Sequence, residues 1–242
     1  MAVYGGPDIV TDGLVLHLDA GNSRSYPGGN TWYDMAKNTV GTLSDHVWTP
    51  EGNGSFVFNN SFASRVQSNN PDLSLASGSN NSTVIIFCKP DSTGPTNQYT
   101  GLVSWGTRGV YNPSTARILS LYTSGTTMFV SSAFWGNDWT PNNLSVKPNS
   151  WNLIAMVSRG QATSNNVSHY RINSEGFGSQ TGSSLSASRT LNTANTSFGI
   201  GITDYPGRYF KGSVAVVSIY SKELTPLEIQ EYYISFKGRF GL

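Results

Sequence analysis

The chain has 242 residues, of which 12% are charged and 37% are hydrophobic, and its formal net charge is +1. So small a charge provides no field to attract nucleic acid or an anionic membrane, and no apolar run approaches the ~20 residues of a membrane-spanning helix. The 26 glycines and the abundance of Ser, Thr and Asn are typical of strands and turns, and this length favours one large all-β domain over two small ones.

The first eight residues are predicted to form an extended arm. Gly5 and Gly6 precede Pro7, a combination that does not hold a regular element. Such an arm either frays in a monomer or docks on a neighbouring subunit in an assembly. The start has neither the basic residues nor the apolar core of a secretory signal peptide, so we expect the protein to be made and folded in a cytosol.

A short apolar strand is predicted at residues 14–19. Its His17 lies among apolar residues, and no second histidine stands at metal-ligand spacing. We therefore predict that His17 is hydrogen-bonded in the core or at its rim, and that it is not a metal ligand.

The middle of the chain alternates predicted strands with turns. Phe56 and Phe58 share one face of their strand, and the run that contains Cys88 is almost continuously apolar, as in a central strand of a sandwich. Cys88 is the only cysteine, so no intrachain disulfide can form and a buried thiol is expected. Gly176 can supply the positive φ of a turn. The predicted strands cover residues 55–59, 82–89, 101–106, 117–122, 127–134, 150–157, 167–173 and 196–202.

A hairpin, a glycine-rich strand and a long loop are also predicted. Residues 117–122 and 127–134 are predicted to form a hairpin around a turn at residues 123–126. Residues 196–202 alternate glycine with bulky side chains, and glycine on one face of a strand allows another backbone or a packed aromatic ring to approach closely. Residues 183–195, rich in Ser, Thr, Ala and Asn, are expected to form a long surface loop.

The end of the chain predicts one short helix near residues 225–237. Thr225 and Glu228 form a capping box, and Pro226 stands at the first helical position. Gly238 is the expected stop. The apolar stripe of this helix is predicted to consist of Leu227, Ile229, Tyr232, Tyr233 and Phe236.

The predicted fold is all-β: a single jelly-roll sandwich of two antiparallel sheets, with one short C-terminal helix. In this organisation residues 1–8 are the arm and residues 9–242 are the sandwich domain. No repeat of fixed period is present, so a propeller or a solenoid is not expected.

Both ends of the chain resemble a known family. The final strand and helix, with residues 10–34 and the tail at residues 237–241, are similar to concanavalin A-like lectin/glucanase domains of the laminin G-like branch, in particular those of tailed-phage virions from marine and cyanobacterial phages. The resemblance implies that Trp32 and Tyr33 fold back onto the core. Many relatives carry an Asp-Asp pair where this chain has Asn59 and Asn60, which weakens any inference of a cation or sugar site there.

Catalysis by a carboxylate pair is not expected. Glucanases with this fold carry two carboxylates on one strand, as Glu-x-Asp-x-x-Glu or Glu-x-Asp-x-Glu, so that both face the sugar. The sequence also lacks nucleophile-elbow, zinc-protease and phosphate-loop motifs. No such carboxylate pattern begins at any of the glutamates, which are Glu51, Glu175, Glu223, Glu228 and Glu231.

A loop rich in aromatic residues is the first candidate for binding. Trp135 and Trp139 flank Asn137 and Asp138. Aromatic faces stack on the C–H surfaces of sugars, while amide and carboxylate groups bind hydroxyls or a cation. The sequence therefore predicts a glycan-binding site at this loop.

The second candidate precedes the last strand and contains Asp204, Tyr205 and Arg208. No cofactor is expected. A calcium ion is left open, with Asp138 and Asp204 as ligands, although no motif specifies the other oxygen ligands that calcium needs. The alternative for both loops is that their aromatic residues cover the open edge of the sandwich or pack against a neighbouring subunit, which is the commoner use of such side chains.

Together these features suggest a non-enzymatic structural protein of a phage virion: a capsid decoration or accessory protein, or a component of a fibre or tail. Its expected partners are other virion proteins such as the major capsid protein. Adhesion to cell-surface glycans and formation of a homo-oligomer are left open. It would be located in the virion, after assembly in the host cytoplasm. The alternatives are a free carbohydrate-binding lectin module and, disfavoured by the missing carboxylate pair, a glycoside hydrolase.

Overall fold

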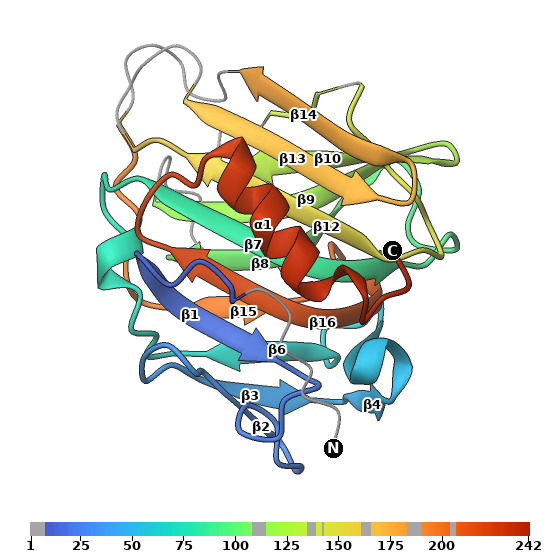
Figure 1. The fold of residues 1–242 in the computed structure, drawn as a ribbon, viewed down its shortest axis with the longest axis horizontal. Coiled ribbons are helices and arrows are strands. Elements are labelled where there is room, and N and C mark those ends of the chain that lie inside the picture. The colour runs from blue at the N-terminus through green and yellow to red at the C-terminus, as the bar shows by residue number, and fades with distance from the viewer. Residues whose placement is uncertain are drawn as a thin grey trace.

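The computed structural model describes residues 8–107, 115–134, 139–141, 143–160, 166–182, 190–203 and 207–242. In this part of the chain two antiparallel sheets of eight strands each face one another, and one helix crosses the outer face of one sheet (Figure 1). This arrangement confirms the predicted all-β sandwich with a C-terminal helix. Of the predicted arm, residues 1–7 lie outside the described residues.

The first sheet lies beneath the helix and is called here the helix-covered sheet. Its strands are β1 (Leu14–Asp19), β4 (Val47–Thr49), β5 (Ser55–Asn59), β7 (Ser82–Pro90), β12 (Asn152–Ser158), β13 (Val167–Asn173), β14 (Gly176–Gly182) and β16 (Lys211–Tyr220). They are arranged in the order β14-β13-β12-β7-β16-β5-β4, and β1 also pairs with β16. Strand β16 has ten residues, so it pairs with β7 along one side and with β5 and then β1 along the other.

The second sheet is called the open sheet. Its strands are β2 (Thr31–Tyr33), β3 (Val40–Ser44), β6 (Arg65–Ser68), β8 (Gln98–Gly106), β9 (Ala116–Ser124), β10 (Thr127–Ala133), β11 (Ser145–Val146) and β15 (Phe198–Ile200). They run in the order β11-β10-β9-β8-β15-β6-β3-β2. The predicted hairpin is confirmed: β9 pairs with β10, and Gly125 takes a φ of 58° in the turn between them. Two short 3-10 helices, η1 (Glu51–Asn53) and η2 (Ser74–Ala76), connect strands.

Strand β7 shows why the central run of the sequence is apolar without alternation. Val84, Ile86 and Cys88 face the interior between the two sheets, whereas Ile85 and Phe87 face the helix. Both faces of the strand are therefore buried, and each position from Val84 to Cys88 is apolar. The prediction of a buried thiol at Cys88 is confirmed, and burial raises its pKa well above the ordinary value.

Close packing explains Gly201, which directly follows β15. Gly201 has a φ of 77°, and a Cβ atom placed on it would lie 2.4 Å from the ring of Phe58. Only glycine therefore fits both the backbone conformation and the approaching aromatic ring. Of the two close approaches predicted for this segment, by another backbone or by a packed aromatic ring, the structure shows the aromatic ring at Gly201.

Helix α1 (Pro226–Lys237) begins with the predicted capping box: the Thr225 hydroxyl accepts from the Glu228 amide, and the Glu228 carboxylate accepts from the Thr225 amide. Ile229 and Tyr232 are buried against the helix-covered sheet. The placement of Leu227 in the apolar stripe was wrong, because its side chain is 65% exposed. At about 100° per residue Leu227 lies some 200° from Ile229, on the solvent side.

The helix ends at the predicted glycine, although not through a left-handed turn. Gly238 has a φ of −62°, in the right-handed region, and its amide donates to the Phe236 carbonyl. Tyr233 and Phe236 are partly buried against the same cluster as the rest of the apolar stripe. In the described part of the chain no helix is long and apolar enough to cross a membrane.

The capping box gives the first testable prediction. Replacing Thr225 with alanine is expected to lower the free energy of unfolding by ~1 kcal/mol, because the amide of Glu228 loses its acceptor. Urea denaturation followed by circular dichroism measures the change. Leu227→Ala is the matched control in the first turn, and we expect it to change stability by less than ~0.5 kcal/mol. Equal losses in the two variants would contradict a role for the cap.

A hydrogen-bond chain joins β1, β16 and α1. The Nδ1 atom of His17 lies 2.8 Å from the Ser218 hydroxyl, which lies 2.6 Å from the Tyr232 hydroxyl. Burial lowers the pKa of His17 to about 4, while Asp19 opposes the shift and Arg239 adds to it. The prediction of a hydrogen-bonded core histidine is confirmed.

Two expectations from the sequence need correction, one about an aromatic pair and one about a loop. Trp32 is fully buried as expected, but Tyr33 is 43% exposed, because successive residues of β2 face opposite sides of the sheet. The expected surface loop at residues 183–195 is described only from residue 190, and there Leu191 and Thr193 are buried. The Thr193 backbone pairs with Gly78, which draws this segment onto the sandwich.

Candidate functional site: a polar groove on the open sheet

The outer face of the open sheet is lined by small and polar residues. Val66, Leu43 and Phe198 face the interior, so their neighbours along β6, β3 and β15 face outward. The strand register places these outward residues in one row across four strands, from Ser104 through Gly199 and Gln67 to Thr42. Gly199 adds no side chain to this row, so the sheet surface is low at its centre.

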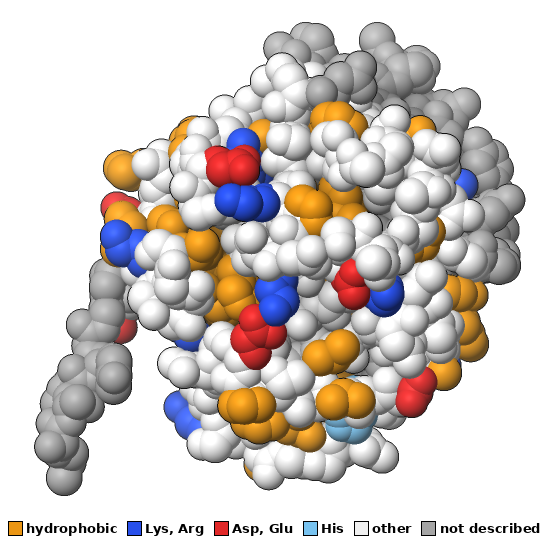
Figure 2. Space-filling view, turned by 90° about the vertical axis from the view of Figure 1, so that its right-hand side faces the viewer, with side chains coloured by type: hydrophobic (Ala, Val, Ile, Leu, Met, Phe, Trp, Pro, Cys, Tyr) orange, Lys and Arg blue, Asp and Glu red, His pale blue; other side chains and the backbone are white. Residues whose placement is uncertain are grey.

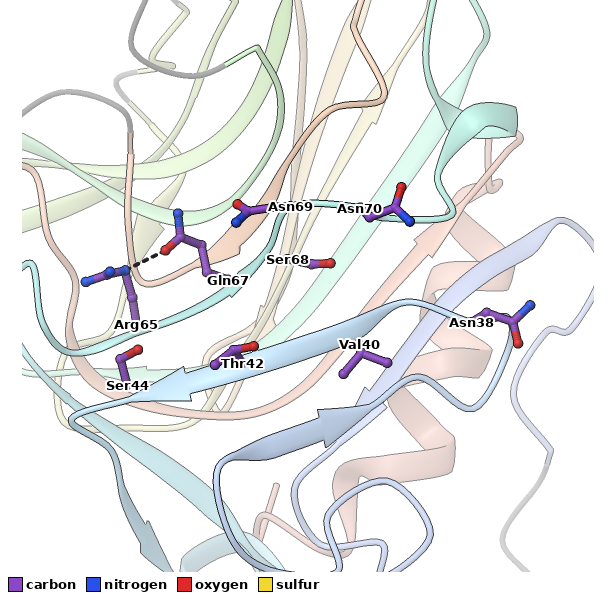
Figure 3. Close-up of a pocket in the computed structure, with 9 residues that line it drawn as sticks. All are labelled: Asn38, Val40, Thr42, Ser44, Arg65, Gln67, Ser68, Asn69 and Asn70. Atoms are coloured by element: carbon purple, nitrogen blue, oxygen red, sulfur yellow. Dashed lines mark hydrogen bonds between the residues drawn. The ribbon is translucent and has the colours of Figure 1, made fainter.

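A groove of about 580 Å³ lies at the β3–β6 end of this face (Figure 3). Its lining side chains offer amide and hydroxyl groups, with one guanidinium and one valine. Figure 3 shows Arg65, Gln67 and Ser44 at one end, and Asn38 and Asn70 at the other. The lining residues are Asn38, Val40, Thr42, Ser44, Arg65, Gln67, Ser68, Asn69 and Asn70.

Arg65 is held in place by three contacts. Its Nε donates to Gln67 Oε1 at 2.7 Å, and its Nη1 donates to the Phe62 carbonyl. The guanidinium also lies over the Phe62 ring, 4.1 Å from the centroid, although that ring is 55% exposed. The two hydrogen bonds use two of the five N–H groups of the guanidinium, and three are left for a ligand or water.

A series of ring contacts leads from the groove toward β8 and β9. Phe62 lies 5.9 Å from Tyr209, measured between ring centroids. The neighbouring Arg208 guanidinium lies 5.3 Å from the centroid of the Tyr99 ring, and Tyr99 lies 4.7 Å from Tyr122. The Arg208 carbonyl accepts from the Gly101 amide at 3.2 Å, which holds this segment beside β8. The last residue of the second predicted loop, Tyr209, thus contacts Phe62, the ring over which Arg65 of the groove lies.

The structure places two of the seven predicted glycan-binding residues, Trp139 and Arg208. Trp135, Asn137, Asp138, Asp204 and Tyr205 lie outside the described residues. The Trp139 ring stacks on His169 with a centroid distance of 4.7 Å and packs against Gly182, and its backbone pairs with Ser132. His169 therefore occupies one face of this indole.

Neither of the proposed calcium ligands, Asp138 and Asp204, is among the described residues. Within the part that the structure describes, no group of three or more His, Cys, Asp or Glu side chains lies close enough to bind a metal ion. The groove, rather than a charged cluster, is therefore the site that the described residues support.

Sequence reasoning did not find the groove. Its strands are short, with five residues in β3 and four in β6, and their polar outward side chains give no apolar run. Thr42 and Gln67 become neighbours only through a register between strands that are more than 20 residues apart. The weak signal was the alternation of polar and apolar residues at 42–44 and 65–67.

Most of the chain matches a known protein family. Residues 59–230 match the family model described as the concanavalin A-like lectin/glucanases superfamily. No curated protein sequence matches the chain.

Solved structures share the fold at low sequence identity. Domain 4 of AbnA, a GH43 extracellular arabinanase from Geobacillus stearothermophilus in complex with arabinotriose, is 16% identical, with a TM-score of 0.61 over 92% of this chain and 98% of that domain. The Botulinum neurotoxin type G receptor binding domain is 13% identical, with a TM-score of 0.60 over 92% of this chain. Trypanosoma rangeli sialidase in complex with sialic acid is 15% identical, with a TM-score of 0.63 over 93% of this chain. This chain spans 51% of the neurotoxin chain and 33% of the sialidase chain.

Proposed function

Because the chain belongs to the concanavalin A-like lectin/glucanase superfamily and is laminin G-like, we propose that it is a non-enzymatic glycan-binding domain whose site is the groove on the open sheet. The observation that carries this proposal is the lining of the groove. Amide and hydroxyl groups from two adjacent strands converge there, with the exposed Phe62 ring beside them. Such groups exchange hydrogen bonds with sugar hydroxyls, and an aromatic ring at the rim packs on sugar C–H groups.

The positions of the carboxylates support a binding role without hydrolysis. None of the nine groove-lining residues is Asp or Glu. In the described part of the chain Glu223 pairs with Arg159 at 2.7 Å, and Glu228 pairs with Lys222 at 2.9 Å and caps the helix. Glycoside hydrolysis by a carboxylate pair needs two such groups on opposite sides of one sugar bond. The fold neighbour solved with arabinotriose is consistent with a sugar-binding use of this fold, although its low identity supports the fold alone.

Glycan binding is tested with a pair of double variants. Thr42→Ala with Gln67→Ala removes two polar groups at the centre of the groove, and we expect affinity for the best ligand on a glycan array to fall about tenfold, since each lost hydrogen bond costs ~0.5–1.5 kcal/mol. The matched control is Gln98→Ala with Thr127→Ala, which changes exposed residues of the same types at the hairpin end of the same sheet.

Isothermal titration calorimetry measures the affinities, and thermal melting shows that both double variants fold. Binding that is equal in the two double variants would remove the groove as the site. The failure of every arrayed glycan to bind at millimolar concentration would remove the glycan-binding function.

We propose further that this domain is displayed on a tailed-phage virion, as a decoration, fibre or tail protein that adheres to host or environmental glycans. The support is the resemblance of residues 10–34 and 237–241 to virion proteins. The proposal requires the protein to co-purify with particles through a density gradient. Its absence from the particle proteome by mass spectrometry would contradict it.

A further inference from the structure

Arg65 presents a fixed guanidinium at one end of the groove. The side chain is held by Gln67, by the Phe62 carbonyl and by the Phe62 ring, so binding a ligand would cost little further side-chain entropy. A planar guanidinium with unused N–H groups matches the two oxygens of a carboxylate or a sulfate, and a charged hydrogen bond is about twice as strong as a neutral one.

The charge around Arg65 distinguishes it from most other cations of the described chain. Many basic side chains pair with carboxylates, and Figure 2 shows acidic and basic side chains as neighbours on one face. Among the described residues no carboxylate forms an ion pair with Arg65. Asp45, which follows the groove residue Ser44, accepts a hydrogen bond from Asn59 at 3.1 Å instead. The ion pairs involve Lys89, Lys147, Arg159, Arg171, Lys211, Lys222 and Arg239.

The rest of the groove is neutral and suited to sugar hydroxyls. From Arg65 it continues over Thr42 to Asn38 and Asn70 (Figure 3). A ligand that fits this arrangement has one anionic group at one end and several hydroxyls along its length. An anion alone would leave the amides unused, and a neutral sugar would leave the charge of Arg65 and its remaining N–H groups without an anionic acceptor.

We propose that the groove selects acidic saccharides, with Arg65 binding a carboxylate or sulfate group of the sugar. This inference rests on the proposed glycan-binding function and names the ligand class of the same site. The positive charge of Arg65 gives the preference for acidic over neutral sugars, and the neighbouring amides and hydroxyls bind the sugar itself.

The test is an array on which each glycan backbone is present in an acidic and a neutral form. Uronate-containing oligosaccharides are paired with their methyl esters, and sulfated oligosaccharides with desulfated counterparts. We expect the wild-type protein to bind acidic members at least ~10-fold more tightly than their neutral partners, as expected for one charged hydrogen-bonded contact. The uronate and sulfate pairs show which anionic group is recognised.

Variants of Arg65 assign the preference to this residue. Arg65→Gln is expected to abolish the preference while neutral glycans still bind, and Arg65→Lys is expected to retain part of it, because lysine keeps the charge but loses the planar fork. Arg24→Gln, which changes an exposed arginine away from the groove-lining residues, is the control and should retain the full preference. Raising the salt concentration should weaken wild-type binding of acidic glycans and leave Arg65→Gln unaffected.

The outcomes separate this inference from the function on which it rests. Equal binding of acidic and neutral partners by the wild-type protein, or an unchanged preference in Arg65→Gln, would overturn the inference and leave glycan binding intact. Failure to bind any member of the array would overturn both.

Discussion

Replacing Arg117 with alanine is expected to lower the free energy of unfolding by ~3–5 kcal/mol, the range for truncating a large buried side chain that also donates hydrogen bonds, and the largest loss that we expect from one substitution in this chain. Arg117 belongs to β9 of the open sheet, and its side chain is fully buried between the sheets. Its Nη1 donates to the hydroxyls of Ser82 and Ser158, which lie opposite one another on β7 and β12. The side chain therefore connects the two sheets.

The other donors of Arg117 are also used. Nε donates to the Thr193 hydroxyl at 3.0 Å, and Nη2 donates to the carbonyls of Gly78 at 3.2 Å and Asn80 at 2.6 Å. All these acceptors are neutral. Burial lowers the pKa of Arg117 to about 9, so the side chain remains a cation at neutral pH. Removing it would leave five oxygen acceptors without this donor, and would also leave a cavity.

Urea denaturation at pH 7.5 measures this loss as a lower midpoint with an unchanged slope. Arg117→Met separates the two causes, because methionine fills much of the space but donates no hydrogen bond. We expect Arg117→Met to restore only a minor part of the lost stability, since the hydrogen bonds lost at the buried oxygens cost more than the cavity. Arg24→Ala, at an exposed arginine, should change stability by less than ~0.5 kcal/mol. An Arg117→Ala protein as stable as Arg24→Ala would show that the buried network contributes nothing.

Arg117 also shows where prediction from the sequence ends. The strand that contains it was predicted, because the apolar residues around it have the pattern of a sandwich strand. The inward direction of its side chain was not predicted, because a charged residue on a strand is ordinarily placed facing water. Its partners come from four other segments of the chain, and only the assembled sandwich brings their oxygens to one point.

The helix could be predicted from the sequence and the groove could not, for the same reason. The capping box of α1 involves residues three positions apart, so local sequence was sufficient to predict it. The groove depends on the pairing of β3 with β6 and of β6 with β15, whose residues are distant along the chain. Of the two loops that sequence composition favoured, the second ends at Tyr209, whose ring contacts Phe62 beside Arg65. Trp139 from the first loop has one face of its ring against His169.

The second large effect is a loss of folding stability in acid, caused by a buried histidine. His169 is fully buried, and neither of its ring nitrogens has a hydrogen-bond partner among the described residues. Burial lowers its pKa to about 3, from an ordinary value of 6.5. Well above pH 6.5 the imidazole is neutral in both the folded and the unfolded chain, so its titration does not affect stability there. Below pH 6.5 the unfolded chain binds a proton that the folded chain does not, and stability is lost as the pH falls toward 3.

His17 also makes the folded chain less stable in acid, because its pKa of about 4 is likewise below the ordinary value. Between pH 7.5 and pH 5 each histidine is expected to remove ~2 kcal/mol of stability, from 1.36 kcal/mol per pKa unit. The pKa of Asp34 is raised by burial, which favours its protonated form in the folded chain and offsets part of the loss. Asp91 and Glu228 have lowered pKa values, so their losses occur in more acidic solution.

His169→Phe is expected to reduce the stability loss between pH 7.5 and pH 5 by about half, that is, by ~2 kcal/mol. Phenylalanine cannot titrate and can still stack on Trp139, so stability at pH 7.5 should be unchanged or higher. His169→Gln is the matched variant: it also cannot titrate, but it buries an amide without a known partner and should be less stable at both pH values. Urea midpoints at the two pH values measure these differences. If His169→Phe lost as much stability on acidification as the wild-type protein, the buried neutral imidazole would not be a source of the acid sensitivity.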